Sequence, residues 1–202
     1  MAEPPEKPSR SARDPDRPSL WARIRGRMSV AAIEAVRGGV RRLPRERALR
    51  LGGTLGRAYA RLHGPRTSTA RINLALAFPE LPAAERERLC LDTYANLGRM
   101  VAETALLGSL SREELLATAD IEGYEHLEAA RKSWPGGGAI ILTAHFGSFE
   151  LFGAIMTSRG VPLSIVHRGA NNPHLDGLIS QWRMVYGGEV IRRGVAARRA
   201  GG

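Results

Sequence analysis

The sequence feature that most constrains the fold is an uninterrupted apolar run, AIILTA, at residues 139–144. A run of this length is typical of a strand that is buried on both faces of a sheet. The pattern then predicts a helix at 149–158, a second buried strand at 161–167, a helix at 173–186 and the start of a third strand at 189–192. Such alternation predicts right-handed βαβ units and a mainly parallel sheet. We therefore expect an α/β fold whose sheet is incomplete, because the chain ends within the next predicted helix.

Helical patterns occupy the residues before this alternation. Apolar residues recur at helical spacing over residues 20–43, with arginines at many of the positions between them, and Pro44 ends the segment. A second helix is predicted to carry one stripe of Leu51, Leu55, Tyr59 and Leu62. A long helix is predicted at 83–107, with an inward face that includes Leu89, Tyr94, Leu97, Val101 and Ala105. The sequence SREE at 111–114 has the form of a capping box and predicts another helix start.

Charge is unevenly distributed along the chain. The net charge is +10 at pH 7, and residues 1–66 carry all of the excess, with 16 Lys and Arg against 6 Asp and Glu. From residue 67 onward the two signs balance at 14 each. A basic segment of this kind favours an anionic membrane surface or nucleic acid as a partner. Nucleic acid is not favoured, because the sequence has neither zinc-ligand spacing nor an RNP-like aromatic motif.

The N-terminal region is predicted to have two parts. Residues 1–18 are polar and rich in proline, which indicates a disordered leader without the apolar core of a signal peptide. Residues 19–66 are predicted to form basic amphipathic helices, which suit a membrane interface or, alternatively, pack on the domain with a solvated basic face. No stretch of 18 or more apolar residues occurs in the sequence, so no transmembrane helix is expected. We therefore expect a chain on the cytoplasmic side, either soluble or held at a membrane surface.

His145 and Glu150 are the strongest candidates for chemistry. Ligands bind at the carboxyl ends of strands in open α/β sheets, and His145 falls at that end of the strand predicted at 139–144. Glu150 follows at the start of the next helix, so the spacing brings an imidazole and a carboxylate together. A histidine can take a proton from an alcohol near neutral pH, and a nearby carboxylate can fix its tautomer. Gly147 permits a tight turn and a close approach of substrate.

Other interpretations of these residues stay open when they are taken alone. A histidine at a strand end is often structural, and a His-x4-Glu pair occurs by chance. Ser148 is not favoured as a nucleophile, because the G-x-S-x-G elbow is absent. A metal site through His145, His167 and His174 has no supporting ligand spacing. Nucleotide-binding motifs are also missing, so neither a metal nor a bound cofactor is expected.

Four blocks, taken in order, resemble the bacterial lipid A biosynthesis acyltransferase family of lauroyl and myristoyl type, within the lysophospholipid acyltransferase superfamily. The blocks are NLALAFPE at 73–80, GAIILTAHFGSFE at 138–150, HR at 167–168 followed by NPHLD at 172–176, and Arg183. The resemblance spans about residues 43–193. It implies a glycerolipid acyltransferase-like fold. It also implies transfer of a fatty acyl chain from an acyl carrier protein or coenzyme A thioester, as co-substrate, to a hydroxyl of a glycolipid.

The same resemblance implies roles for individual residues. His145 would be the general base that activates the hydroxyl, and Glu150 would orient His145 and balance its charge. Arg168 and Arg183 stand where the family has arginines, which implies contacts to phosphates or to the carrier, and an arginine fork suits phosphate. The remaining substrate-binding candidates are Gly147, Ser148 and Asn172.

The sequence departs from the family pattern at both ends. Members commonly carry an apolar anchor near the N-terminus, where this chain has an amphipathic, Arg-rich segment. Members also continue to an acidic Asp-Gln block, which is missing here, so residues 67–202 are interpreted as a truncated N-terminal portion of the acyltransferase domain. We expect a peripheral enzyme at the cytoplasmic face of the inner membrane, with anionic lipid, a glycolipid acceptor and acyl carrier protein as partners. The alternative is a non-catalytic, membrane-associated fragment.

Overall fold

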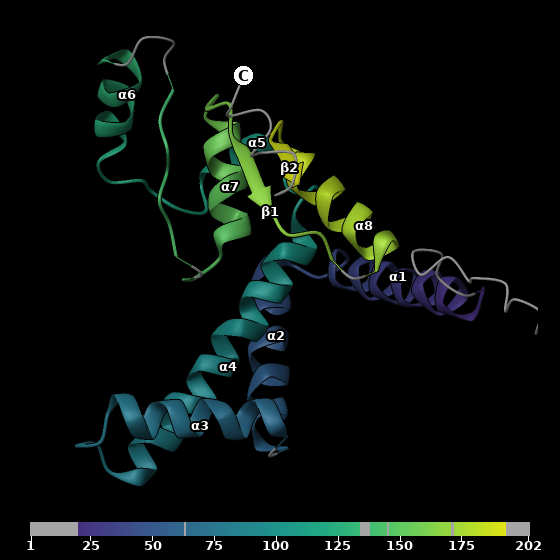
Figure 1. Ribbon diagram of the computed structural model, residues 1–202, viewed down its shortest axis with the longest axis vertical. Helices are drawn as coiled ribbons and strands as arrows, with labels where there is room; N and C mark the ends of the chain where they lie inside the picture. The colour runs from purple at the N-terminus through teal and green to yellow at the C-terminus, as the bar shows by residue number, and fades with distance from the viewer. Residues whose placement is uncertain (1–19, 63, 134–137, 145, 171, 193–202) are drawn as a thin grey trace, which may run out of the picture.

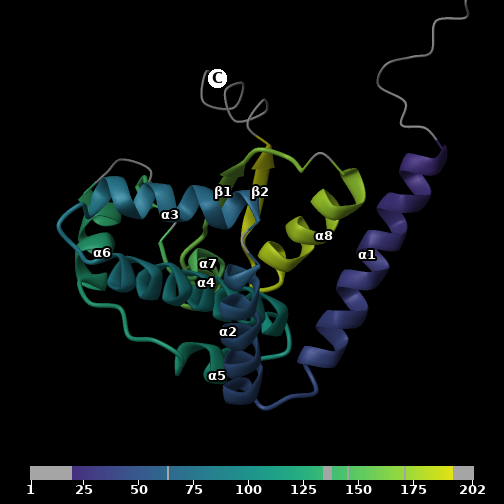
Figure 2. The ribbon, with the colours of Figure 1, turned by 90° about the horizontal axis from the view of Figure 1, so that it is seen from below.

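The computed structural model describes residues 20–62, 64–133, 138–144, 146–170 and 172–192. The described chain is mostly helical and contains a small parallel sheet of two strands (Figures 1 and 2). The expected leader at residues 1–18, the candidate base His145 and the chain after residue 192 lie outside the described residues.

Proline positions separate the first helices much as the sequence predicts. Pro44 stands between α1 (Leu20–Val40) and α2 (Arg45–Arg61), and Pro82 immediately precedes α4 (Ala83–Leu106). The third helix, α3 (Pro65–Ala77), begins with a proline in its first turn, where the missing N–H removes no helical hydrogen bond. In Figure 1, α2 and α4 run side by side and α3 crosses them at one end.

The second half of the chain carries shorter elements. Helix α5 (Arg112–Leu116) begins with the predicted capping box, in which the Ser111 Oγ accepts the Glu114 N–H and the Ser111 N–H donates to the Glu114 carboxylate. Helix α6 (Tyr124–Ser133) stands apart from the remaining helices in the view of Figure 1. Helix α7 (Phe149–Ser158) begins directly after the turn that contains Gly147.

The sheet consists of β1 (Ser164–His167) and β2 (Glu189–Arg192), which are joined by α8 (Pro173–Met184). The strands pair in parallel, with Ser164 opposite Glu189 and His167 opposite Arg192. Helix α7 precedes β1 and packs on α5 through a core that contains Leu107, Leu115 and Ile155. The prediction of an α/β chain with a helical N-terminal part and parallel strand pairing is thus confirmed at this level.

Residues 139–144, predicted to be a strand buried on both faces, do not form a strand in the structure. The side chains of Ile140 and Leu142 are 98% and 95% exposed. The physical reason is that the segment has no hydrogen-bonded neighbour among the described strands, and a cavity lined by both residues 138–143 and β1 lies between the two. Residues 121–123 turn at Gly123, which has φ +73°.

Three glycines allow α2 and α4 to pack with their backbones close together. A Cβ built on Gly98 of α4 would overlap the carbonyl oxygen of Gly52, and one on Gly56 would overlap that of Tyr94. Small residues at such spacing permit an approach that larger side chains prevent. The inward face predicted for α4 is wrong at two positions, because the side chains of Leu97 and Val101 are 46% and 61% exposed.

Helix α1 is attached to the C-terminal end of α4 by two arginines. Arg37 donates to the carbonyl oxygens of Ala105 (3.2 Å) and Leu107 (2.8 Å), and Arg41 donates to the same two oxygens at 3.2 and 2.6 Å. The last carbonyls of a helix have no partner within the helix, so these guanidinium groups satisfy them. Among the described residues, no helix combines the length and the hydropathy that crossing a membrane requires.

Candidate functional site

The turn before α7 has the geometry that the sequence motif requires. Gly147 has φ +59°, a left-handed conformation that a residue with a Cβ rarely adopts, and a Cβ there would meet nothing within 4 Å. Ser148 occupies the N-cap position of α7, although its side chain accepts no capping hydrogen bond. Its Oγ is buried and, within the described part of the chain, has no hydrogen-bond partner. His145, two residues before Gly147, lies outside the described residues.

Glu150 forms a bidentate ion pair with Arg183. The Arg183 Nε lies 3.1 and 3.0 Å from the two carboxylate oxygens, and Nη2 lies 2.6 Å from Oε1. Both side chains are largely buried, with 15% and 14% exposure. Paired N–H donors on a carboxylate fix its position as well as its charge. Glu150 is therefore held in one orientation at the start of α7.

The two helix ends reinforce this ion pair. Glu150 lies in the first turn of α7, where the helix dipole favours negative charge. Arg183 lies in the last turn of α8, where the dipole favours positive charge. The salt bridge thus joins the N-terminus of α7 to the C-terminus of α8, and each charge has the sign that the dipole of its own helix favours.

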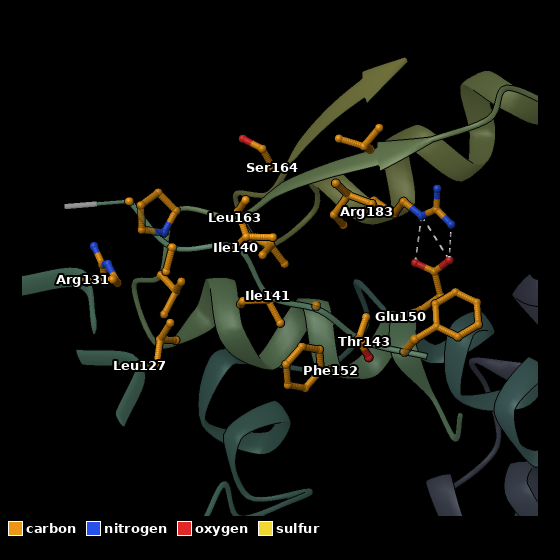
Figure 3. A pocket seen from close by; sticks show the side chains of 18 residues that line it. Leu127, Arg131, Ile140, Ile141, Thr143, Glu150, Phe152, Leu163, Ser164 and Arg183 are labelled. Carbon is orange, nitrogen blue, oxygen red and sulfur yellow. Dashed lines mark hydrogen bonds and ion pairs between the residues drawn. The ribbon is translucent and has the colours of Figure 1, made fainter. Parts of the chain in front are cut away.

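Two cavities meet at the Glu150–Arg183 pair. The larger has a volume of about 800 Å³ and lies between residues 138–143, α7 and β1. Figure 3 shows Glu150 and Arg183 facing one another at one end of it, with the aliphatic side chains of Ile140, Ile141 and Leu163 along its walls. The smaller cavity, of about 520 Å³, also has Glu150 and Arg183 in its wall. One ion pair therefore borders two largely apolar spaces.

Helices α1, α4 and α8 and the start of α7 form the walls of the smaller cavity. Apolar side chains dominate it, among them Val36, Met100, Val101, Ile179 and Trp182. At the same wall, the Arg37 guanidinium lies 4.6 Å from the centroid of the Trp182 ring, which allows a cation–π contact. Burial lowers the pKa of Arg37 from its ordinary value, and the neighbouring charge of Arg41 acts in the same direction.

The other two sequence candidates lie between β1 and α8. Arg168 is exposed just after β1. Asn172 caps α8, because its Oδ1 accepts the His174 N–H at 3.0 Å, and its Nδ2 donates to the Gly26 carbonyl of α1 at 3.4 Å. Asn172 thus contacts two helices, and its assignment to substrate stays a prediction, as does that of Arg168.

Sequence reasoning missed two contacts at this site. It assigned Arg183 to phosphate or carrier and Glu150 to His145, but it did not connect Glu150 with Arg183, which is 33 residues away. It also missed His167 and Asp176, whose Nδ1 and Oδ1 lie 4.0 Å apart with both side chains nearly buried. The only sequence signal for the first pair is opposite charge at the ends of two predicted helices. For the second, both residues fall within the quoted motif blocks.

The geometry allows a specific kind of chemistry. A carboxylate that is held in place by an arginine can orient an imidazole, and Glu150 follows the motif histidine by five residues in the sequence. The adjoining cavities can hold aliphatic groups on either side of the charged pair. Within the described residues, no group of three or more His, Cys, Asp or Glu side chains is close enough together to hold a metal ion.

Comparisons with known proteins agree with the motif blocks. The family described as "Bacterial lipid A biosynthesis acyltransferase" matches residues 23–200. The palmitoleoyltransferase of lipid A biosynthesis from Escherichia coli K12 is 30% identical over 119 residues, which is 59% of this chain and 38% of that protein. The myristoyltransferase of the same pathway and organism is 29% identical over 139 residues, or 69% of this chain and 42% of that protein.

A third relative, the E. coli lipid A biosynthesis lauroyltransferase, is 27% identical over 142 residues, or 70% of this chain and 45% of that protein. The chain therefore spans less than half the length of the curated relatives it matches. No solved structure matches it. Because the family match extends over most of the sequence, the chain belongs to the bacterial lipid A biosynthesis acyltransferase family.

Proposed function

We propose that the protein transfers a fatty acyl chain from an acyl carrier protein or coenzyme A thioester to a hydroxyl of a lipid A precursor or related glycolipid. The observation that carries the proposal is the Glu150–Arg183 pair at the junction of two apolar cavities. Joining two lipid substrates requires apolar space on both sides of the reacting atoms. The relatives' names, which specify palmitoleoyl, myristoyl and lauroyl groups, support a fatty acyl donor.

In this proposal His145 removes the proton from the acceptor hydroxyl as its oxygen attacks the thioester carbonyl. The carbon–sulfur bond of the tetrahedral intermediate then breaks, and the thiolate takes the proton from the imidazolium. Glu150 orients His145 and balances its positive charge, while Arg183 holds Glu150 in place. Within the described residues no hydrogen bond involves Nη1 of Arg183, so this nitrogen remains able to contact a phosphate of the substrate.

The charge distribution along the chain supports a proposal for the partners and the location. We propose an anionic membrane surface at the cytoplasmic face of the inner membrane as the working location, with the protein bound peripherally. All of the net positive charge lies in residues 1–66, which suits anionic headgroups and steers an acidic carrier protein. Residues 19–66 would serve as the basic helical segment, and residues 67–202 as part of the acyltransferase domain.

Val101→Glu tests whether the smaller cavity holds an acyl chain. Val101 lines this cavity and is 61% exposed, so a carboxylate there is compatible with folding but excludes an aliphatic chain. We expect the kcat/KM for acyl transfer to fall about 10-fold or more, because a charge adjoining a buried methylene chain is costly. The variant is incubated with defined thioester donors and a glycolipid acceptor, and the acylated glycolipid is quantified by mass spectrometry.

Leu97→Glu is the matched control for this prediction. Leu97 lies one helical turn earlier on α4, is 46% exposed and lines neither cavity. Its substitution is expected to leave transfer within about two-fold of the parent protein. Equal loss in both variants, or no loss in Val101→Glu, would contradict the assignment of the smaller cavity. Thioester hydrolysis without any acylated glycolipid would contradict the proposed function itself.

A further inference from the structure

Helix α1 carries two stripes on opposite faces. Gly26, Val30, Ile33 and Arg37 are buried or partly buried, and this face packs toward α8 and α4. A second stripe, here called the outward stripe, has the same alternating spacing of three and four residues and consists of Trp21, Ile24, Met28, Ala31 and Ala35. At about 100° per residue, the centres of the two stripes lie roughly 170° apart.

The outward stripe is apolar and unpartnered within the described chain. Trp21 and Met28 are 79% and 67% exposed, Ile24 is 38% exposed, and both alanines are exposed. Figure 2 shows α1 at the edge of the molecule, with α8 on its inner side. Exposed apolar residues that line up over four helical turns mark an interaction surface rather than ordinary scatter.

Charge indicates what kind of partner this surface fits. Exposed Arg25 and Arg27 lie on the two borders of the outward stripe, each about 80° from its centre. The only acidic residue of α1, Glu34, is bound to Arg37 at 3.2 Å on the packed side. A second copy docked along the same stripe would place arginines against arginines without an acidic partner, which disfavours a helix pair. Phosphate headgroups bordering an apolar layer match the pattern.

We propose that α1 docks in the plane of an anionic lipid surface, with the outward stripe among the acyl chains and Arg25 and Arg27 at the headgroups. This is the arrangement of an interfacial amphipathic helix. The opposite face of the same helix holds the domain through Arg37 and Asn172. In this arrangement α1 lies in the plane of the membrane surface, between the bilayer and the rest of the protein.

The docking also deepens the proposed function, on which this step rests. Ala32 and Val36 border the outward stripe and line the smaller cavity, together with Ile33 and Arg37 from the packed face of α1. That cavity reaches Glu150 and Arg183. A docked helix therefore sets the cavity beside the bilayer, so that a lipid acceptor can approach the ion pair while its other chains remain in the membrane.

Vesicle sedimentation of the protein that contains this chain tests the docking surface. Vesicles of phosphatidylcholine mixed with phosphatidylglycerol are compared with vesicles of phosphatidylcholine alone. Met28→Glu is expected to weaken binding to the anionic vesicles about 10-fold, because it places a carboxylate in the apolar layer. The double substitution of Arg25→Ala and Arg27→Ala is expected to weaken binding about 25-fold, from roughly five-fold for each basic residue near the surface.

Leu76→Glu provides the matched control. Leu76 lies on α3, is 75% exposed and is not part of α1. Its substitution is expected to change vesicle binding by less than about two-fold. Equal loss with Leu76→Glu, or unchanged binding with Met28→Glu, would overturn the proposal. A change of oligomeric state in Met28→Glu with vesicle binding unaltered would overturn it in favour of a protein partner.

Trp21 supplies a direct readout of depth. The protein's tryptophan fluorescence is expected to shift to shorter wavelength on adding anionic vesicles. Because the chain has three tryptophans, the contribution of Trp21 is the part of the shift that Trp21→Phe removes, and binding is expected to persist because phenylalanine keeps the stripe apolar. A shift of undiminished size in Trp21→Phe would contradict insertion of the stripe.

The His145→Ala variant separates this inference from the proposed function. It is expected to bind vesicles as the parent protein does, because His145 is not part of α1. Met28→Glu, conversely, is expected to retain transfer to a detergent-dispersed acceptor and to lose transfer on vesicles. If no variant transfers acyl groups but Met28→Glu still fails to bind vesicles, the docking stands and the proposed function fails.

Discussion

Replacing Arg183 with alanine is expected to lower both the activity and the stability of the protein. The substitution leaves the Glu150 carboxylate, only 15% exposed, without its bidentate partner. Removing one member of a buried ion pair costs about 3–5 kcal/mol, and partial exposure here reduces the expected loss to about 2 kcal/mol. Unfolding in urea, followed by circular dichroism, measures this change.

The kinetics of the same variant distinguish two roles for Arg183. If it positions Glu150, Arg183→Ala lowers kcat by about 10²-fold, because a misoriented carboxylate no longer fixes the tautomer of His145. If it only binds substrate phosphate, the substitution raises KM and leaves kcat and stability nearly unchanged. Arg183→Lys is expected to recover part of kcat, since one ammonium restores the charge but not the two-point contact. A pure KM effect would refute the positioning role.

Arg168→Ala is the matched control for Arg183→Ala. Arg168 is exposed, and replacing an exposed arginine typically changes the free energy of unfolding by less than about 0.5 kcal/mol. A loss of stability equal to that of Arg183→Ala would show that the effect does not come from the Glu150 contact.

Gly98→Ala is expected to be strongly destabilising, as one of the single-methyl additions that would push α2 and α4 apart. The new Cβ would overlap the backbone carbonyl of Gly52, which cannot rotate away as a side chain can, so α2 and α4 must separate. Overpacking of this kind costs about 1–3 kcal/mol, and separation of the backbones along the whole contact favours the upper end. Thermal unfolding, with the midpoint compared at equal protein concentration, measures the effect.

The matched control makes the same change at Gly39 of α1. A Cβ at Gly39 would meet nothing within 4 Å, so only the intrinsic helix preference changes. Alanine is favoured over glycine by about 1 kcal/mol in a helix, and Gly39→Ala is therefore expected to be neutral or slightly stabilising. If Gly98→Ala were as well tolerated as Gly39→Ala, the close backbone contact of α2 and α4 would be wrong.

Local signals made much of the secondary structure predictable. Pro44 and the capping box at Ser111 act on the helix boundary through only a few neighbouring residues, and the structure has helix boundaries at both. The predicted helix at 149–158 agrees with α7 because an apolar stretch begins directly after the turn at Gly147. The long helix predicted at 83–107 differs from α4 by one residue at its end.

Burial was less predictable, because it depends on what packs against each element. The 139–144 run has the composition of a buried strand, yet its side chains are exposed where no described strand pairs with it. In α1, the residues with the clearest apolar spacing face outward, while Gly26 and Arg37 lie on the packed side. Apolar periodicity predicts that a helix has an apolar face, but it does not predict whether that face packs on the rest of the protein or points outward.

In the candidate site, too, local features were predictable from the sequence and tertiary contacts were not. His145 and Glu150 could be recognised because motif and helix start lie close in sequence, whereas the Glu150–Arg183 contact joins α7 to α8 through tertiary packing alone. The two cavities were likewise invisible to sequence reasoning, because their walls come from helices far apart in the chain.

The most direct measurement of the central claim is the rate of acyl transfer to a lipid A precursor by three proteins: the parent, His145→Ala and Glu150→Gln. Circular dichroism must first show that all three are folded. His145→Ala is expected to lower kcat by about 10²–10⁴-fold, the range that a general base contributes. Glu150→Gln should also lower kcat, because an uncharged amide cannot balance the imidazolium. Transfer by His145→Ala within about two-fold of the parent rate would contradict the claim that this histidine carries the chemistry.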